Sequence, residues 1–180
     1  IAWAMCLGTV PIAVLGLLAA PAIEGPFRSV GVIIVALVLG SLWLWAAVRQ
    51  PAGVRQAHDL GVREVLGIGV AQAAALVPGV SRSGATIGAG LLLGLDRADA
   101  ARFSFLLSVP AITLAGLFEL RELGSGAAPP GPTAAAVGVA FVSGYATIRV
   151  LLRITAEGRL GGFIVYRLAL AGLLIAGLIL

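Results

Sequence analysis

The sequence lacks most of what a water-soluble surface requires. It contains no lysine, and only 11% of its 180 residues are charged, whereas 60% are hydrophobic and the mean hydropathy is +1.09. Since a soluble domain carries about a quarter charged residues, these proportions exclude a chain surrounded by water. The hydrophobic residues come in runs separated by short charged loops. This pattern predicts an all-α, polytopic membrane protein that forms one domain.

Cysteine and histidine are equally scarce. Cys6 is the only cysteine, so no disulfide can form within the chain. His58 is the only histidine, and beside Asp59 it could act as a base, but a single histidine in a polar loop is usually solvated. The net charge of +4 comes from loop arginines, which lipid headgroups and topology explain better than nucleic acid does.

Five segments are long and apolar enough to cross a bilayer, which takes roughly 20 residues of helix. They cover residues 1–20, 30–48, 103–120, 133–152 and 160–180. Trp43 and Trp45 lie near the end of the second segment and are predicted to anchor it at the interface. A Gly/Pro-rich stretch at 124–132 predicts a turn, and the polar residues 49–64 predict an exposed connection.

The segment 65–95 is apolar but interrupted in its middle. Its halves, 65–80 and 84–95, flank Ser81-Arg82-Ser83, and each half is too short to cross a bilayer. The segment is therefore predicted to be a re-entrant helix-loop-helix that enters the membrane and returns to the same side.

The distribution of arginine supports this re-entrant layout. With a re-entrant segment, one side of the membrane holds Arg49, Arg55, Arg63, Arg97, Arg102, Arg149, Arg153, Arg159 and Arg167. The other side keeps Arg28 and Arg121, whereas a single crossing of the segment would remove most of the bias. The layout places the loop 49–64 in the cytoplasm and Leu180 outside. Arg167 lies within the last span, and its long side chain is predicted to snorkel to the interface.

The interruption carries the residue types of an anion site. Because a charge at membrane depth is costly, Arg82 should line a wet cavity or meet an anion. Pro78-Gly79 ends the first half-helix, and Ser83 is a candidate N-cap of the second, whose amides from Gly84 to Thr86 would then lack helical partners. A guanidinium can bind two phosphate oxygens while hydroxyls and amides donate around them, so the pattern favours phosphate over carboxylate.

Other interpretations of this region stay open. Arg82 could pair with a helix C-terminus while the serines only cap, which would make the segment a structural packing device. Re-entrant half-helices also build carrier sites, so the chain could be a transporter or a lipid flippase. Gln72, in the first half-helix, could face the cavity or link helices.

Several stretches resemble the undecaprenyl-diphosphatase family. Gly69–Ile87, which contains the run Pro-Gly-Val-Ser-Arg-Ser-Gly, resembles the second signature of that family and is followed by Gly90–Leu95. The similarity continues through Phe103–Leu107 with Pro110, and through Phe163–Arg167. It therefore covers essentially the whole chain.

The resemblance implies a bacterial plasma-membrane enzyme with inverted repeats, each carrying a re-entrant element. Such an enzyme removes the terminal phosphate from undecaprenyl diphosphate and so recycles the lipid carrier of cell-wall synthesis. The catalytic residues implied are Ser81, Arg82 and Thr86. The candidate substrate-binding residues are Gln72, Gly79, Ser83 and Gly84. The resemblance also implies a divalent cation, Mg²⁺ or Ca²⁺, and an active site that faces outward, and it leaves a homodimer open.

One part of the family pattern is missing. Members carry an earlier signature with paired glutamates and a Pro-Val-Ser-Ser-Thr-Gly-His run, and nothing in residues 1–64 resembles it. The chain therefore looks like the C-terminal two-thirds of such an enzyme. Cleavage of a P–O–P bond needs an activated nucleophile and usually a metal clamp, which call for carboxylates or histidine. The candidate carboxylates occupy loop positions that favour solvated roles: Glu24, Glu64, Asp96 and Asp99.

Overall fold

The structure is a computed structural model that describes residues 1–123 and 130–179, without the side chains of 24, 118–123 and 130. These ranges form helices and loops and contain no β-strand, which confirms the predicted all-α class. The helices are α1 (Ala2–Leu18), α2 (Ala20–Glu24), α3 (Val30–Val48), α4 (Val62–Ala73), α5 (Arg82–Leu92), α6 (Arg97–Leu123), α7 (Pro130–Ala156) and α8 (Gly161–Ile179). Three short 3-10 helices are η1 (Pro26–Arg28), η2 (Ala57–Asp59) and η3 (Ala74–Leu76).

Four helices are long and apolar enough to cross a membrane. They are α3, residues Arg97–Leu117 of α6, residues Gly131–Ala156 of α7, and α8. A fifth crossing arises if α1 and the segment Ala20–Arg28 form one span, which is bent by 76°. These helices fit a multi-pass membrane protein. Outside the described residues lie most of the predicted turn at 124–132, the side chain of Arg121, and Leu180.

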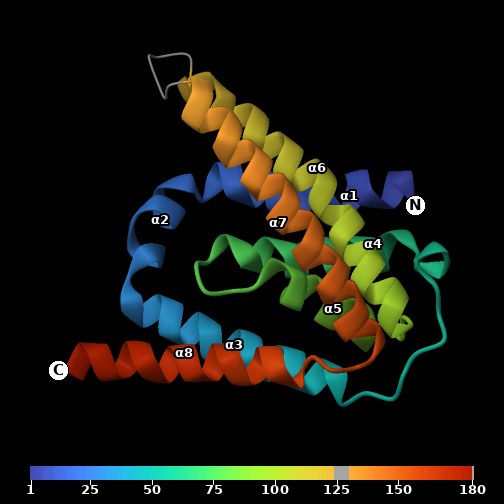
Figure 1. The fold of residues 1–180 in the computed structure, drawn as a ribbon. Coiled ribbons are helices and arrows are strands. Elements are labelled where there is room, and N and C mark those ends of the chain that lie inside the picture. The colour runs from blue at the N-terminus through green and yellow to red at the C-terminus, as the bar shows by residue number, and fades with distance from the viewer. Residues whose placement is uncertain (124–129, 180) are drawn as a thin grey trace.

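The helices surround a short central hairpin (Figure 1). α3 and α8 pack side by side in antiparallel directions, and α6 packs against α7 in a second, longer pair. Between them α4 packs on α1, while α5 packs on α3, α4 and α6. The hairpin tip, between η3 and α5, lies between α1 and α3 (Figure 1).

The interrupted segment forms the predicted helix-loop-helix. α4 has 12 residues and continues through η3, and α5 has 11 residues. Neither arm reaches the length of a membrane span, as a re-entrant element requires. The predicted boundaries are wrong by a few residues, because α4 begins at Val62 and α5 ends at Leu92, before Gly94 turns the chain with φ +81°. The depth of the hairpin in the membrane stays a prediction.

Two glycines bring α1 and α4 into close contact. A Cβ at Gly69 would lie 2.5 Å from the carbonyl oxygen of Gly8, so the two backbones touch at this crossing. Gln72, which is fully buried, donates its side-chain N–H to the same carbonyl at 3.4 Å. This bond links α4 to α1, which is one of the two alternatives for Gln72. The Oε1 of Gln72 is buried without a hydrogen-bond partner among the described residues, and its predicted contact with substrate stays a prediction.

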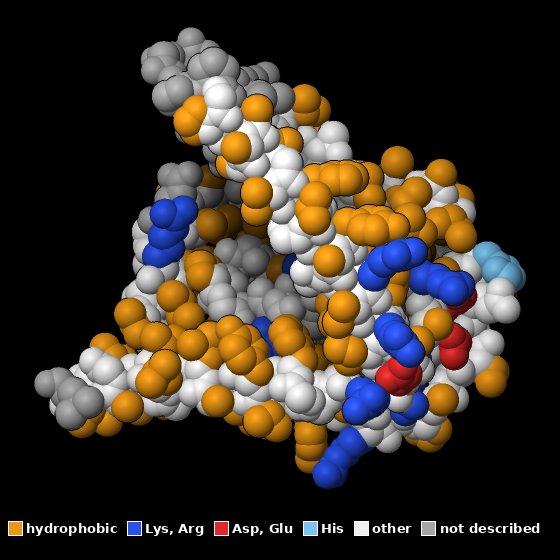
Figure 2. All heavy atoms as spheres, in the orientation of Figure 1, with side chains coloured by type: hydrophobic (Ala, Val, Ile, Leu, Met, Phe, Trp, Pro, Cys, Tyr) orange, Lys and Arg blue, Asp and Glu red, His pale blue; other side chains and the backbone are white. Residues whose placement is uncertain are grey.

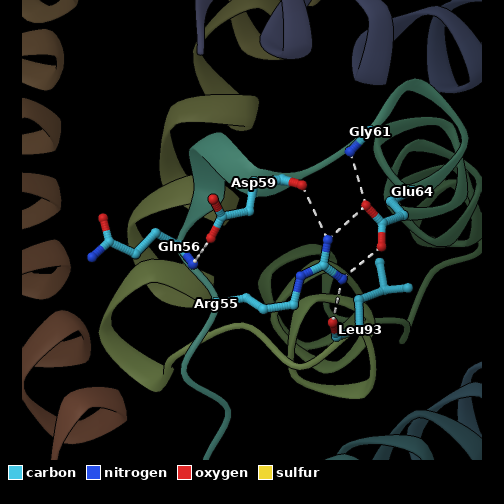
Figure 3. Close-up of polar contacts among 6 residues, drawn as sticks. All are labelled: Arg55, Gln56, Asp59, Gly61, Glu64 and Leu93. Carbon is cyan, nitrogen blue, oxygen red and sulfur yellow. Dashed lines mark hydrogen bonds and ion pairs between the residues drawn. The ribbon is translucent and has the colours of Figure 1, made fainter.

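The connection between α3 and α4 is docked onto the base of the hairpin (Figure 3). Arg55 donates to both carboxylate oxygens of Glu64, at 2.6 and 2.9 Å, and to the carbonyls of Leu93 at 2.9 Å and Asp59 at 3.1 Å. Glu64 also accepts the amide of Gly61 at 2.8 Å. Most residues of 49–64 are exposed, as predicted, but the connection is also fixed in place. The bidentate ion pair ties it to α4, and the bond to the Leu93 carbonyl ties it to the end of α5.

Backbone pairing strengthens the same docking. The amide of Arg55 donates to the carbonyl of Gly94 at 3.2 Å, and the amide of Asp96 donates back to the carbonyl of Arg55 at 2.9 Å. A Cβ at Gly53 would collide with the carbonyl of Gly94, so only glycine lets the loop approach this closely. The base of the hairpin is thus held by side-chain and main-chain contacts together.

The ion pair predicts a pH dependence of stability. The hydrogen bond from Arg55, followed by that from the amide of Gly61, lowers the pKa of Glu64 from 4.5 to about 2. A carboxylate whose pKa is lower in the folded state stabilises the fold above its unfolded pKa and loses that effect as the pH falls. We expect the melting temperature in detergent to fall between pH 4.5 and 2. The Glu64→Gln variant should show a smaller fall, and an unchanged pH profile would contradict the role of this pair.

Candidate anion site at the hairpin tip

The tip of the hairpin turns at Gly79. The amide of Val80 donates to the carbonyl of Val77 at 3.1 Å, and Gly79 takes φ +97°, which side chains with a Cβ rarely adopt. A Cβ at this position would also lie 2.7 Å from the carbonyl oxygen of Ile33 in α3. Glycine is therefore needed both for the turn and for the close approach to α3.

Ser81 is the N-cap of α5. Its backbone is extended, its Oγ accepts the amide of Gly84 at 3.1 Å, and its carbonyl accepts the amide of Ala85 at 2.9 Å. The prediction that Ser83 caps the helix and leaves the amides from Gly84 onward free is therefore wrong by two residues. Among the described residues, the amides of Arg82 and Ser83 have no acceptor, as expected for the first two positions of a helix.

The hydroxyls near this turn occupy different environments. The Oγ atoms of Ser81 and Ser83 lie 3.3 Å apart, and both residues are half-buried. Thr86 is buried, and its Oγ1 is within hydrogen-bond distance of the Arg82 carbonyl at 2.9 Å and of the Ser104 hydroxyl in α6. Thr86 thus ties the first turn of α5 to α6. The Ser83 carbonyl lies 3.3 Å from the same hydroxyl, and a direct role of Thr86 on substrate stays a prediction.

The guanidinium of Arg82 has no partner within the described part of the chain. It is half-buried, and neither an ion pair nor a hydrogen bond from its side chain to residues 1–123 or 130–179 is present. The alternative pairing with a helix C-terminus therefore finds no support. A partly desolvated cation without a counter-ion is unfavourable unless water or an anion meets it. The tip thus combines an unpaired cation with hydroxyls and two free amides.

A groove of about 640 Å³ begins beside this tip and is lined by α3, α4, α5 and α8. Apart from Ser81 and Arg167, its walls are almost wholly apolar and include Val35, Leu39 and Phe163. Gly84 also lines it, and a Cβ there would lie 3.2 Å from the Oγ of Ser81. In Figure 2 the surface is hollowed between the α3–α8 pair and the α6–α7 pair.

Trp43 joins α3 to α5 beside this groove. Its indole N–H donates to the carbonyl of Ala85 at 3.3 Å, and a Cβ at Gly88 would collide with the indole ring. The predicted role of Trp43 as an interfacial anchor is therefore incomplete, since the ring also fixes α5. Trp45 is exposed and stacks under the guanidinium of Arg49 at 3.8 Å, consistent with its predicted anchoring role.

Arg167 is buried, with only 4% of its surface exposed. From α8 its Nε donates to the hydroxyl of Ser41 at 3.2 Å. Its Nη2 donates to the carbonyls of Ala36 and Leu37 at 3.3 Å each, and to the carbonyl of Gly79 at 3.0 Å. The prediction that Arg167 snorkels to the interface is wrong, because these acceptors satisfy its donors inside the protein.

The candidate acid-base residues lie away from the tip. His58 is exposed in η2, 3.4 Å from a carboxylate oxygen of Asp59, which agrees with the prediction of a solvated histidine. Asp96 accepts the first amides of α6, and Asp99 accepts an amide of η2. The Asp96 carboxylate therefore caps α6, and that of Asp99 ties α6 to the loop before the hairpin.

A divalent cation finds no fitting ligand set here. No group of three or more His, Cys, Asp or Glu side chains comes together in residues 1–123 and 130–179, apart from side chains that the structure does not describe, such as that of Glu24. Mg²⁺ and Ca²⁺ prefer carboxylate and carbonyl oxygens, whereas the tip offers a cation, hydroxyls and amides. The described residues do not fit the metal that the family resemblance implies.

Comparison with known proteins decides the family. The family model described as bacitracin resistance protein BacA matches residues 1–173. The chain belongs to this family. It is 46% identical over 98% of its length to undecaprenyl-diphosphatase 2 of Frankia casuarinae, and 45% identical over 97% to undecaprenyl-diphosphatase of Myxococcus xanthus. It covers 65% and 60% of those relatives, so this BacA family chain spans less than two thirds of their length.

The turn at the tip predicts a glycine requirement. Replacing Gly79 by alanine puts a Cβ where φ is +97° and against the carbonyl of Ile33, so we expect a loss of about 1–3 kcal/mol in stability. Thermal unfolding of the purified protein in detergent measures it. The matched control is Gly67→Ala in α4, where a Cβ meets nothing within 4 Å. Equal melting temperatures for the two variants would contradict the requirement.

Proposed function

We propose that this chain forms the phosphate-binding part of an enzyme that hydrolyses undecaprenyl diphosphate to the monophosphate and inorganic phosphate. The observation that carries the proposal is Arg82, a half-buried guanidinium without a counter-ion in the described residues. It stands at the first turn of α5, beside the hydroxyls of Ser81 and Ser83. The undecaprenyl-diphosphatase names of the relatives supply the substrate class.

The start of α5 suits a phosphoryl group. Two amides without acceptors and the positive end of an 11-residue helix attract anions, and Arg82 can contact two phosphate oxygens at once. During hydrolysis, water forms a bond to the terminal phosphorus while the bond from phosphorus to the bridging oxygen breaks. Arg82 then neutralises charge on the transferred phosphoryl group and on the bridging oxygen, which stays on the lipid.

Ser81 serves as a donor to the phosphate in this proposal. Its Oγ contacts the amide of Gly84 and the hydroxyl of Ser83, and neither group can remove its proton. A serine nucleophile needs an adjacent base. The base that deprotonates the attacking water, and the ligands of any divalent cation such as Mg²⁺ or Ca²⁺, would come from outside the described side chains.

The surroundings of the tip support a lipid substrate that is reached from outside. The groove beside Ser81 has apolar walls, which suit a polyprenyl chain. Arginines gather at the end of the molecule that holds the base of the hairpin and the α7–α8 connection (Figure 2). By the positive-inside rule this end faces the cytoplasm, so the tip lies farther from that side.

Substitution of Arg82 tests the proposal in the full-length protein. We expect Arg82→Ala to lower phosphate release from undecaprenyl diphosphate about 10²- to 10³-fold, the usual cost of losing a preorganised donor to transition-state charge. The control is Arg63→Ala, which removes an exposed arginine at the base of the hairpin. Unchanged turnover in Arg82→Ala, or movement of intact lipid across vesicles without phosphate release, would contradict the hydrolase.

The missing chemistry gives a second prediction. Purified residues 1–180 should release little or no phosphate from undecaprenyl diphosphate, because the described part brings no base or metal ligand to the tip. Phosphate release is measured beside the full-length Frankia casuarinae relative in the same detergent and with added Mg²⁺ or Ca²⁺. Robust turnover by residues 1–180 would show that this chain holds a complete catalytic centre.

A further inference from the structure

Arg167 carries a buried charge that nothing in the described residues neutralises. Its four hydrogen bonds all go to uncharged acceptors, one hydroxyl and three carbonyls. The ion pairs of the described residues do not include it, and no hydrogen bond uses its Nη1 atom. A buried arginine is usually paired with a carboxylate. A side chain that served only to link α8 to α3 would not need a charge at this place.

The guanidinium reaches the site from a distant part of the chain. Arg167 lies in α8, 88 residues beyond Gly79, yet its Nη2 donates to the Gly79 carbonyl at 3.0 Å. It also lines the same groove as Ser81. The side chain of Arg167 passes α3 at Gly40, where a Cβ would collide with its Nη2 atom. Glycine at this point of α3 therefore opens the notch through which the side chain passes.

We propose that Arg167 is a positioning residue of the anion site. Its hydrogen bond to the carbonyl oxygen of Gly79 fixes the turn two residues before the N-cap Ser81. The positive guanidinium also offsets the partial negative charge of that carbonyl oxygen next to the proposed anion position. Its charge places a positive group in the groove that also contains Ser81, where apolar walls screen it weakly. This inference rests on the proposed function, because it assumes that a diphosphate binds at the tip.

The competing role is a clamp between α8 and α3. In that case the contacts to Ser41 and to the α3 carbonyls matter, and the contact to Gly79 is incidental. A clamp predicts lower thermal stability but unchanged turnover for each folded molecule. A positioning role predicts weaker diphosphate binding and slower turnover even in the folded fraction.

Two kinds of variant separate these roles in the full-length protein. Arg167→Gln removes the charge, whereas Gly40→Ala keeps the charge and displaces Nη2 from its acceptors. The matched control is Gly172→Ala in α8, where a Cβ meets nothing within 4 Å. For each variant the folded fraction is isolated by size exclusion, and kcat and KM for undecaprenyl diphosphate are expressed per folded molecule. Inhibition by inorganic pyrophosphate gives the affinity of the site for the anion.

We expect Arg167→Gln to lower kcat/KM by about 10²-fold, and Gly40→Ala by at least roughly tenfold, since small displacements of a binding group are costly. Both should weaken pyrophosphate inhibition, Arg167→Lys should recover part of the loss, and Gly172→Ala should match wild type. Wild-type kcat/KM and pyrophosphate inhibition in folded Arg167→Gln and Gly40→Ala would overturn the inference. Arg82→Ala, measured alongside, distinguishes the failures: if it is also fully active, the proposed function itself is wrong.

Discussion

The turn at Gly79 is the constraint on which the site depends. A chain that reverses between packed helices must satisfy its own polar groups, because apolar surroundings supply no hydrogen-bond partners. Here the Gly79 carbonyl accepts from Arg167, and the Gly84 amide donates to the Ser81 hydroxyl. What stays unsatisfied is the guanidinium of Arg82 and the two amides at the start of α5. The turn thus concentrates unused donors at one point, which is what an anion site requires.

The two ends of the hairpin are held by different means. At the base, an ion pair between Arg55 and Glu64 and a stretch of backbone pairing fix both arms to the preceding loop. At the tip, the turn packs against α3, and the buried Arg167 of α8 holds it by a hydrogen bond to the Gly79 carbonyl. Partly exposed ion pairs such as the one at the base are sensitive to pH and salt, whereas buried contacts are much less so. Conditions that loosen the base could therefore leave the tip assembled.

Sequence patterns predicted the hairpin well and its detail less well. Two apolar halves too short to cross a bilayer, separated by Ser81-Arg82-Ser83, predicted the helix-loop-helix and its polar tip. The N-cap was misplaced because Ser81 and Ser83 are equally good capping residues, and only backbone geometry distinguishes them. Arg167 was misassigned because an all-apolar helix has no periodicity that shows which face is buried. Its position well inside the last span, rather than at its end, was the available signal.

The most direct measurement is an experimental structure of the full-length protein bound to a non-hydrolysable analogue of undecaprenyl diphosphate. The geometry of the tip predicts that diphosphate oxygens lie within hydrogen-bond distance of the Arg82 guanidinium and of the amides of Arg82 and Ser83. It also predicts that the Gly79 carbonyl still accepts from Arg167. A diphosphate bound elsewhere, with Arg82 paired to a carboxylate of the protein, would contradict the assignment of this tip as the phosphate-binding site.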